Sequence, residues 1–160
     1  MVSIKTFLTF NDRAEEAARF YTSVFPNSAI TRIARYPDLG PESPFKTGGV
    51  MTVEFTLDGR EFCALNGGPQ FSFNQGISIN VICDTQAEVD EYWGKFVAAG
   101  GKPVACGWIT DHFGVSWQID PRVLIDLVSG SDPVKAGEAM RAMMGMVKIE
   151  SGPLEAIAGG

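Results

Sequence analysis

The sequence has no cluster of basic residues and no long apolar run. Its 13 Lys and Arg residues are outnumbered by 19 Asp and Glu, which gives a formal net charge of −6. Because phosphate binding depends on Lys and Arg, this balance argues against nucleic acid or an anionic membrane as a partner. The longest apolar stretches, such as residues 77–83, have only the length of a strand, and the N-terminal segment lacks an apolar helical core. We therefore expect a cytoplasmic protein that binds neither nucleic acid nor membrane.

Cysteine and histidine are scarce as well. The three cysteines, Cys63, Cys83 and Cys106, are far apart and never in a CxxC or Cys/His spacing. This pattern encodes neither a disulfide framework nor a zinc site, so reduced, buried thiols are expected. A chain of 160 residues can bury enough surface to fold without either. The single histidine, His112, has no histidine partner with which to share a metal. We predict neither a metal nor a cofactor.

Residues 3–66 are predicted to form a β-α-β-β-β module. Residues 4–10 alternate between two faces, as a strand does. A helical period follows, with Asp12 and Glu15 placed to form a capping box. A Pro- and Gly-rich loop precedes a hairpin, whose turn is indicated by Asp58-Gly59. The predicted elements are strands at residues 4–10, 29–36, 50–57 and 61–65, and a helix at residues 14–24.

Residues 76–128 repeat this order. Thr85 and Glu88 are placed to form a capping box, and Gly100-Gly101 ends the helix that it opens. A shift of about 73 residues lays the start of the first helix over the start of the second, which indicates an internal duplication. The predicted elements are strands at residues 77–83, 103–109, 115–119 and 123–128, and a helix from residue 85 to residue 99.

The remaining tail, residues 132–158, is predicted to be helical. Asp132-Pro133 places an N-cap before a proline at the first helical position. Residues 151–158 are expected to add one short helix. The whole chain, residues 1–160, is thus predicted to be a single α+β domain of two tandem modules followed by C-terminal helices.

Three separated segments resemble one family. They are FNDRAEEA at residues 10–17, DHFGVSWQI at residues 111–119 and AMRAMMGMVKI at residues 139–149. In order and spacing they resemble the PhnB-like group, commonly called 3-demethylubiquinone-9 3-methyltransferase. That group is part of the vicinal oxygen chelate superfamily of glyoxalases, dioxygenases and bleomycin resistance proteins. The resemblance covers roughly residues 3–128 and implies that the paired modules curl a mixed sheet into a cup.

The resemblance also implies where a metal would be held. In that superfamily, four strands each supply one ligand to a divalent metal, typically His or Gln, Glu, His and Glu. The corresponding positions here are Thr6, the stretch 63–66, Ser78 and Asp126, which make a poor metal site. No strand-GxGxxG-helix unit for a methyl donor occurs either, so methyltransferase activity is not expected.

Alternation along the predicted strands gives candidate residues for the cup. They are mainly apolar and aromatic with a few polar groups, a composition typical of a small-molecule pocket. His112, in a turn, and Asp126 are the candidate catalytic residues for proton transfer. The candidate ligand-binding residues are Thr6, Leu8, Asn66, Ser78, Asn80, Cys106, Trp108 and Trp117.

The predicted function is the binding or conversion of a small organic metabolite in the cup. A first alternative is a non-catalytic protein that sequesters its ligand, as resistance members do. A second is a metal-dependent lyase or dioxygenase, and a third is a dimeric scaffold without a ligand. Because two-module chains leave sheet edges and apolar faces to cover, a homodimer is expected.

Overall fold

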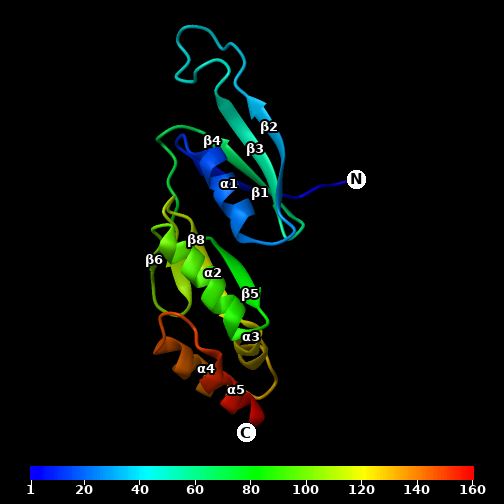
Figure 1. Ribbon diagram of the computed structural model, residues 1–160, viewed down its shortest axis with the longest axis vertical. Coiled ribbons are helices and arrows are strands. Elements are labelled where there is room, and N and C mark those ends of the chain that lie inside the picture. The colour runs from blue at the N-terminus through cyan, green and yellow to red at the C-terminus, as the bar shows by residue number, and fades with distance from the viewer. The chain divides into compact units, whose positions relative to one another are not determined.

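The computed structural model describes residues 1–160 and divides into two compact units, Met1–Ser72 and Phe73–Gly160. Each unit contains one four-stranded mixed sheet with a helix packed on it (Figure 1). The predicted α+β class and the pair of β-α-β-β-β modules are therefore confirmed. None of the helices combines the length and the apolar character needed to cross a membrane.

The first unit forms its sheet in the order β1-β4-β3-β2. Strands β1 and β4 are parallel, whereas β3 is antiparallel to both of its neighbours. The tight turn between β3 and β4 occurs at Asp58 and Gly59, both with positive φ, as the sequence predicts. The elements are β1 (Thr6–Phe10), α1 (Ala14–Val24), β2 (Ala29–Arg35), β3 (Val50–Leu57) and β4 (Arg60–Asn66).

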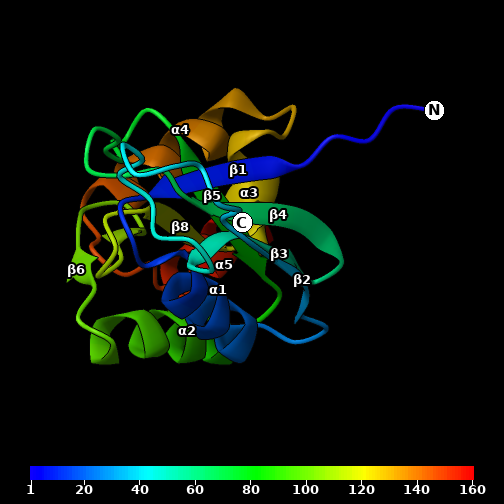
Figure 2. The same ribbon diagram turned by 90° about the horizontal axis from the view of Figure 1, so that it is seen from above.

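Helix α1 covers one face of this sheet (Figure 2). Leu8 is paired with Ala64, and Phe55 is stacked on its partner Phe62 at 5.4 Å. All four side chains are buried on the face that α1 covers. Phe7, which alternates with Leu8, lies on the opposite, helix-free face and is 56% exposed.

The predicted capping box at the start of α1 is wrong. The N-cap residue is Arg13, and no local side chain caps the helix. Instead, the backbone N–H of Ala14 donates to Oδ1 of Asn66 at 2.8 Å, across 52 residues of sequence. Glu15 is engaged by Arg19 one turn later, at 2.6 Å. A tertiary contact from the end of β4 thus replaces the local cap.

The second unit forms its sheet in the order β5-β8-β7-β6, with β5 and β8 parallel. The capping box of Thr85 and Glu88 is present at the start of α2, as predicted. The elements are β5 (Ser78–Cys83), α2 (Gln86–Ala98), β6 (Lys102–Pro103), β7 (Trp108–Thr110), β8 (Ser116–Pro121), α3 (Arg122–Val128), α4 (Pro133–Met144) and α5 (Ser151–Gly159).

Two predicted strands of this unit are wrong. The stretch 103–109 is split between β6 and β7, because Cys106 and Gly107 both have positive φ and cannot extend a strand. The stretch 123–128 is helix α3. Leu124 and Leu127 are three residues apart, which places both on the buried side of that helix. A short apolar run satisfies either period, and here tertiary packing selects the helix.

The C-terminal helices form a small core of their own. Helices α3, α4 and α5 lie together (Figure 1), and their buried side chains include Leu124, Ala139 and Leu154. The connection between α4 and α5 is also hydrogen-bonded to the loop that precedes β7. Backbone N–H groups of Cys106 and Gly107 donate to the carbonyls of Met146 and Val147, each at 2.8 Å.

Candidate functional site

The helix-free face of the second sheet is polar. Trp117 on β8 is buried against α2, where its ring lies 4.9 Å from that of Phe96. Residues that alternate with Trp117 therefore point to the other face. The register between β5 and β8 pairs Ser78 with Ser116, Asn80 with Gln118 and Ile82 with Asp120 on that face.

Side-chain hydrogen bonds join these two strands. Nε2 of Gln118 donates to Oγ of Ser78 at 2.7 Å, and Nδ2 of Asn80 donates to Oδ2 of Asp120 at 2.5 Å. We refer to these four residues as the polar row. Trp108 on β7 is half-buried. It is paired with Gln118 on β8 and therefore lies beside the polar row on the same face. Fixed amide and carboxyl groups thus lie beside an indole ring.

Asp120 has the most unusual environment in the polar row. Its side chain is buried, and this desolvation raises the pKa of its carboxyl above the ordinary value, while the hydrogen bond from Asn80 opposes the rise. Gly107 makes room for it, because a Cβ at Gly107 would lie 2.8 Å from Oδ1 of Asp120 and 2.9 Å from Ile149. Any larger residue at Gly107 would displace the carboxyl or the C-terminal segment.

Ser78, Asn80 and Trp108 thus share the helix-free face, whereas three other predicted ligand-binding residues do not. Trp117 is in the core, where its Nε1 donates to Oδ2 of Asp111 at 2.9 Å. Leu8 is buried on the α1 side of the first sheet, and Thr6, two residues earlier, points the same way. Alternation correctly separates the two faces of a strand, but it does not say which face a helix covers.

The two predicted catalytic residues lie on different elements. Asp126 is exposed on α3. Its predicted inward position on a strand is wrong, because residues 123–128 form a helix. His112 is half-buried in the turn between β7 and β8, with its ring 3.9 Å from that of Phe113. That turn is held by Asp111, whose Oδ1 accepts from the N–H groups of Phe113 and Val115, both at 2.9 Å. Cys106 is half-buried on the loop before β7.

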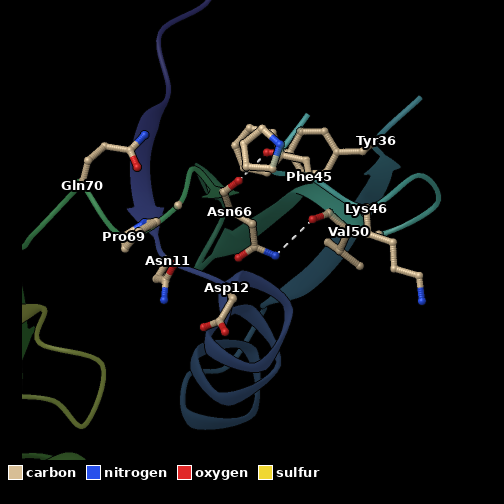
Figure 3. A pocket seen from close by; sticks show the side chains of 12 residues that line it. Asn11, Asp12, Tyr36, Phe45, Lys46, Val50, Asn66, Pro69 and Gln70 are labelled. Atoms are coloured by element: carbon tan, nitrogen blue, oxygen red, sulfur yellow. Dashed lines mark hydrogen bonds between the residues drawn. The ribbon is translucent and has the colours of Figure 1, made fainter. Parts of the chain in front are cut away.

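Asn66 lies at a separate feature, a pocket of about 440 Å³ in the first unit (Figure 3). Its side chain accepts from Ala14 and donates to the carbonyl of Val50 at 3.1 Å. The hydroxyl of Tyr36 donates to the backbone carbonyl of Asn66, and the Tyr36 ring is stacked on Phe45 at 4.4 Å. The lining residues are Asn11, Asp12, Tyr36, Pro44, Phe45, Lys46, Gly49, Val50, Asn66, Gly68, Pro69 and Gln70.

Sequence reasoning missed Gln118 and Asp120, and it missed the aromatic pair Tyr36 and Phe45. A signal for the first two was present, because Pro121 before apolar residues three apart is typical of a helix start. With a helix there, β8 becomes the final strand and its alternate residues become candidates. The Tyr36–Phe45 contact has no such signal, since it depends on how the loop between β2 and β3 folds back.

A divalent metal would need several anionic or imidazole ligands close together. No group of three or more His, Cys, Asp or Glu side chains in the chain is placed to hold one. The polar row contains a single carboxylate, and one of its oxygens already accepts from Asn80. The residues that the superfamily's metal would require are therefore not present, and the donor set does not fit the ion.

Comparison with known proteins identifies the family. The family model for 3-demethylubiquinone-9 3-methyltransferase matches residues 2–120. The chain belongs to this family. A PhnB protein from Bacillus cereus, described by the same methyltransferase name, is 37% identical with a TM-score of 0.66, and the match covers 75% of this chain and 99% of that one. No curated protein matches the chain.

More distant structures share the fold of this PhnB-like protein. Protein PA1353 from Pseudomonas aeruginosa is 22% identical with a TM-score of 0.62, over 76% of this chain and 98% of that one. The fosfomycin resistance protein FosX from Listeria monocytogenes, in complex with Mn(II) and sulfate, is 18% identical with a TM-score of 0.51. That match covers 74% of this chain and 92% of FosX. The resemblance to the PhnB-like group is thus confirmed by the family model and the Bacillus cereus relative, and these more distant structures show a shared fold.

Proposed function

We propose that this PhnB-like protein binds a small organic metabolite on the helix-free face of its second sheet. The observation that supports the proposal is the polar row beside Trp108. Asn80 is exposed and Trp108 is half-buried, so both can contact a ligand. An aromatic side chain beside a few fixed polar groups is a common feature of small-molecule sites. The ligand class that this face suits is a small aromatic or oxygen-rich molecule, whose hydroxyl or carbonyl groups pair with the amides.

Methyl transfer is not part of the proposal, although the family name mentions it. Methyl donors and dinucleotides usually lie against a glycine-rich turn between a strand and a helix. In this chain Asn11, Asp12 and Arg13 join β1 to α1, and Asp84 and Thr85 join β5 to α2. Neither connection contains glycine, so neither lets a phosphate or a methyl donor approach the backbone in that way.

Conversion of the ligand is the second candidate function, and Asp120 is the observation that favours it. A buried carboxyl with a raised pKa retains its proton to higher pH than an exposed one, as a general acid requires. Asp120 would then deliver a proton to a ligand oxygen, with Asn80 orienting the carboxyl through its hydrogen bond. This role takes the place of the proton transfer that the sequence assigns to Asp126.

The test is a ligand screen by thermal shift, with a panel of aromatic acids, hydroxy acids and sugars. Asn80→Ala and Trp108→Ala should each abolish the shift produced by a hit, whereas Asp126→Ala, at an exposed position of α3, should leave it unchanged. A shift that survives both of the first two substitutions would refute the assigned face. Mass spectrometry of the hit after incubation separates binding from conversion. A product formed by the wild type and not by Asp120→Asn supports conversion.

We also propose that the protein is a homodimer. Large apolar side chains are exposed in both units. They include Phe7 on β1 of the first unit, and Ile77 just before β5 and Ile82 on β5 of the second. A second copy of the chain would remove such exposed apolar side chains from water. Sedimentation at micromolar concentration tests the proposal, and a single monomeric species would contradict it.

We propose a cytoplasmic location because the three cysteines are free thiols, and free thiols persist in a reducing compartment. Recovery of the protein in an exported fraction would overturn that location.

A further inference from the structure

The pocket of the first unit is independent of the face proposed above. Its volume of about 440 Å³ lies in the range of small organic ligand sites. Three segments of the first unit form its wall: the connection between β1 and α1, the loop between β2 and β3, and the end of β4 with the residues that follow (Figure 3). None of the residues predicted from the sequence to bind a ligand lies in this pocket except Asn66.

Hydrogen bonds fix the base of the pocket before any ligand arrives. Asn66 connects the first residue of α1 with the first residue of β3, through Ala14 and Val50. The hydroxyl of Tyr36 adds a bond to the carbonyl of Asn66. Because these groups are already ordered, little further conformational entropy is lost when a ligand binds.

One wall of the pocket is flat and apolar. The rings of Tyr36 and Phe45 are parallel to within 7°. Two backbone hydrogen bonds close the loop that carries Phe45: the N–H of Tyr36 donates to the carbonyl of Gly49 at 2.8 Å, and the N–H of Gly48 donates to the carbonyl of Tyr36 at 2.9 Å. Pro44 and Pro69 extend the apolar lining. Flat rings and proline side chains suit a planar apolar group of a ligand.

The charges of the lining are few and opposite. Asp12 and Lys46 are its only charged residues, and neither forms an ion pair or a side-chain hydrogen bond within the chain. Both residues are exposed, so a neutral ligand would leave them hydrated, whereas a charged group of a ligand can pair with the residue of opposite sign. A ligand with both an ammonium and a carboxylate group complements both, which is the basis of charge selectivity at such sites.

We propose that this pocket is a second binding site, and that it takes a small zwitterion with a flat apolar body, in the manner of an aromatic amino acid. The ammonium group faces Asp12, the carboxylate faces Lys46, and the flat body lies along the Tyr36–Phe45 pair. Amides of Asn11 and Gln70 at the rim provide further hydrogen-bonding groups.

Isothermal titration with L-phenylalanine and L-tryptophan tests the site. Two analogues each lack one charge: 3-phenylpropanoate has no ammonium group, and phenethylamine has no carboxylate. Each analogue should bind about five-fold more weakly than phenylalanine, as expected for a single solvent-exposed charge pair. Asp12→Asn should weaken the binding of phenylalanine by a similar factor and leave the affinity for 3-phenylpropanoate unchanged. Lys46→Gln should weaken the binding of phenylalanine and leave the affinity for phenethylamine unchanged.

Control variants separate this site from the proposed function. Asp126→Asn and Lys102→Gln remove exposed charges in the second unit and should leave the affinity for phenylalanine unchanged. Asn80→Ala, which disrupts the polar row, should also leave phenylalanine binding intact. Chemical-shift changes at the side-chain amide of Asn66 should accompany binding and localise it. Absence of binding by both amino acids at millimolar concentration, an affinity of either analogue equal to that of phenylalanine, or loss of phenylalanine binding in Asn80→Ala would each overturn the proposal.

Discussion

Asn80 donates from Nδ2 to Oδ2 of Asp120 at 2.5 Å, and this bond joins the helix-free faces of β5 and β8. Asp120 is 4% exposed, and a Cβ at Gly107 would lie 2.8 Å from its Oδ1. Burial without a neighbouring cation raises the pKa of this carboxyl, in contrast to the surface carboxyl of Glu54, whose pKa a hydrogen bond from Arg32 lowers.

The pH dependence of stability should report the state of Asp120. A carboxyl with a raised pKa binds its proton more tightly in the folded state than in the unfolded state. Its contribution to stability is therefore lost as pH rises from the unfolded pKa, near 3.8, through the folded value. Asp120→Asn keeps an acceptor for Asn80 and removes this loss. Its melting temperature relative to wild type should increase from pH 4 to pH 7, and a constant difference would contradict the assignment.

Asn66 should be more important for stability than an exposed amide. Asn66→Leu keeps the size of the side chain but leaves the N–H of Ala14 and the carbonyl of Val50 without their partner, at a cost of about 2 kcal/mol for the partly buried pair. Asn66→Asp retains the acceptor for Ala14 near the helix N-terminus, so its cost should be smaller. Urea denaturation measures both variants. Equal losses would show that the bond to Ala14 contributes nothing.

The two helix starts should respond differently to matched substitutions. Thr85→Ala removes a side chain that accepts from the N–H of Glu88, which should cost about 1 kcal/mol in unfolding free energy. Asp12→Ala removes no capping hydrogen bond and should cost well under half of that. Chemical denaturation of both variants is the measurement. A large loss in Asp12→Ala would restore the capping role that the sequence suggests.

The thiols should differ in reactivity. Burial, followed by the charge of Glu88 and two nearby aspartates, raises the pKa of Cys83 to about 12, and burial also raises the pKa of Cys63. Only Cys106 is half-exposed. Ellman's reagent at pH 8 should therefore modify a single thiol in the folded protein and all three in denaturant. Cys106→Ser should abolish the native reaction, and rapid modification of Cys83 would contradict the burial.

Features determined by neighbouring residues could be predicted from the sequence. The capping box of Thr85 and Glu88 and the turn at Asp58-Gly59 depend on short-range geometry, and both are present. The order of elements in both modules follows from the same local patterns. The resemblance of three segments to one family then indicates the fold, because their order and spacing are fixed by it.

Features determined by distant residues could not be predicted. Asn66 caps α1 across 52 residues, and no local pattern signals this. The apolar run at residues 123–128 fits a strand or a helix equally well. The helix is selected by the core that Leu124 and Leu127 share with Ile149. Leu8 and Trp117 alternate correctly with their neighbours, yet both point to the helix-covered face. The candidate site shifts accordingly, from Asp126 and Trp117 to Gln118 and Asp120.

The C-terminal segment lies beyond residue 120, where the family match ends. Yet the carbonyls of Met146 and Val147 in that segment accept from the N–H groups of Cys106 and Gly107, and a Cβ at Gly107 would lie 2.9 Å from Ile149 and 2.8 Å from Oδ1 of Asp120. The C-terminal segment and the buried carboxyl of Asp120 thus meet at the same glycine. A side chain introduced at Gly107 would therefore disturb the position of Asp120 and the docking of the C-terminal segment together.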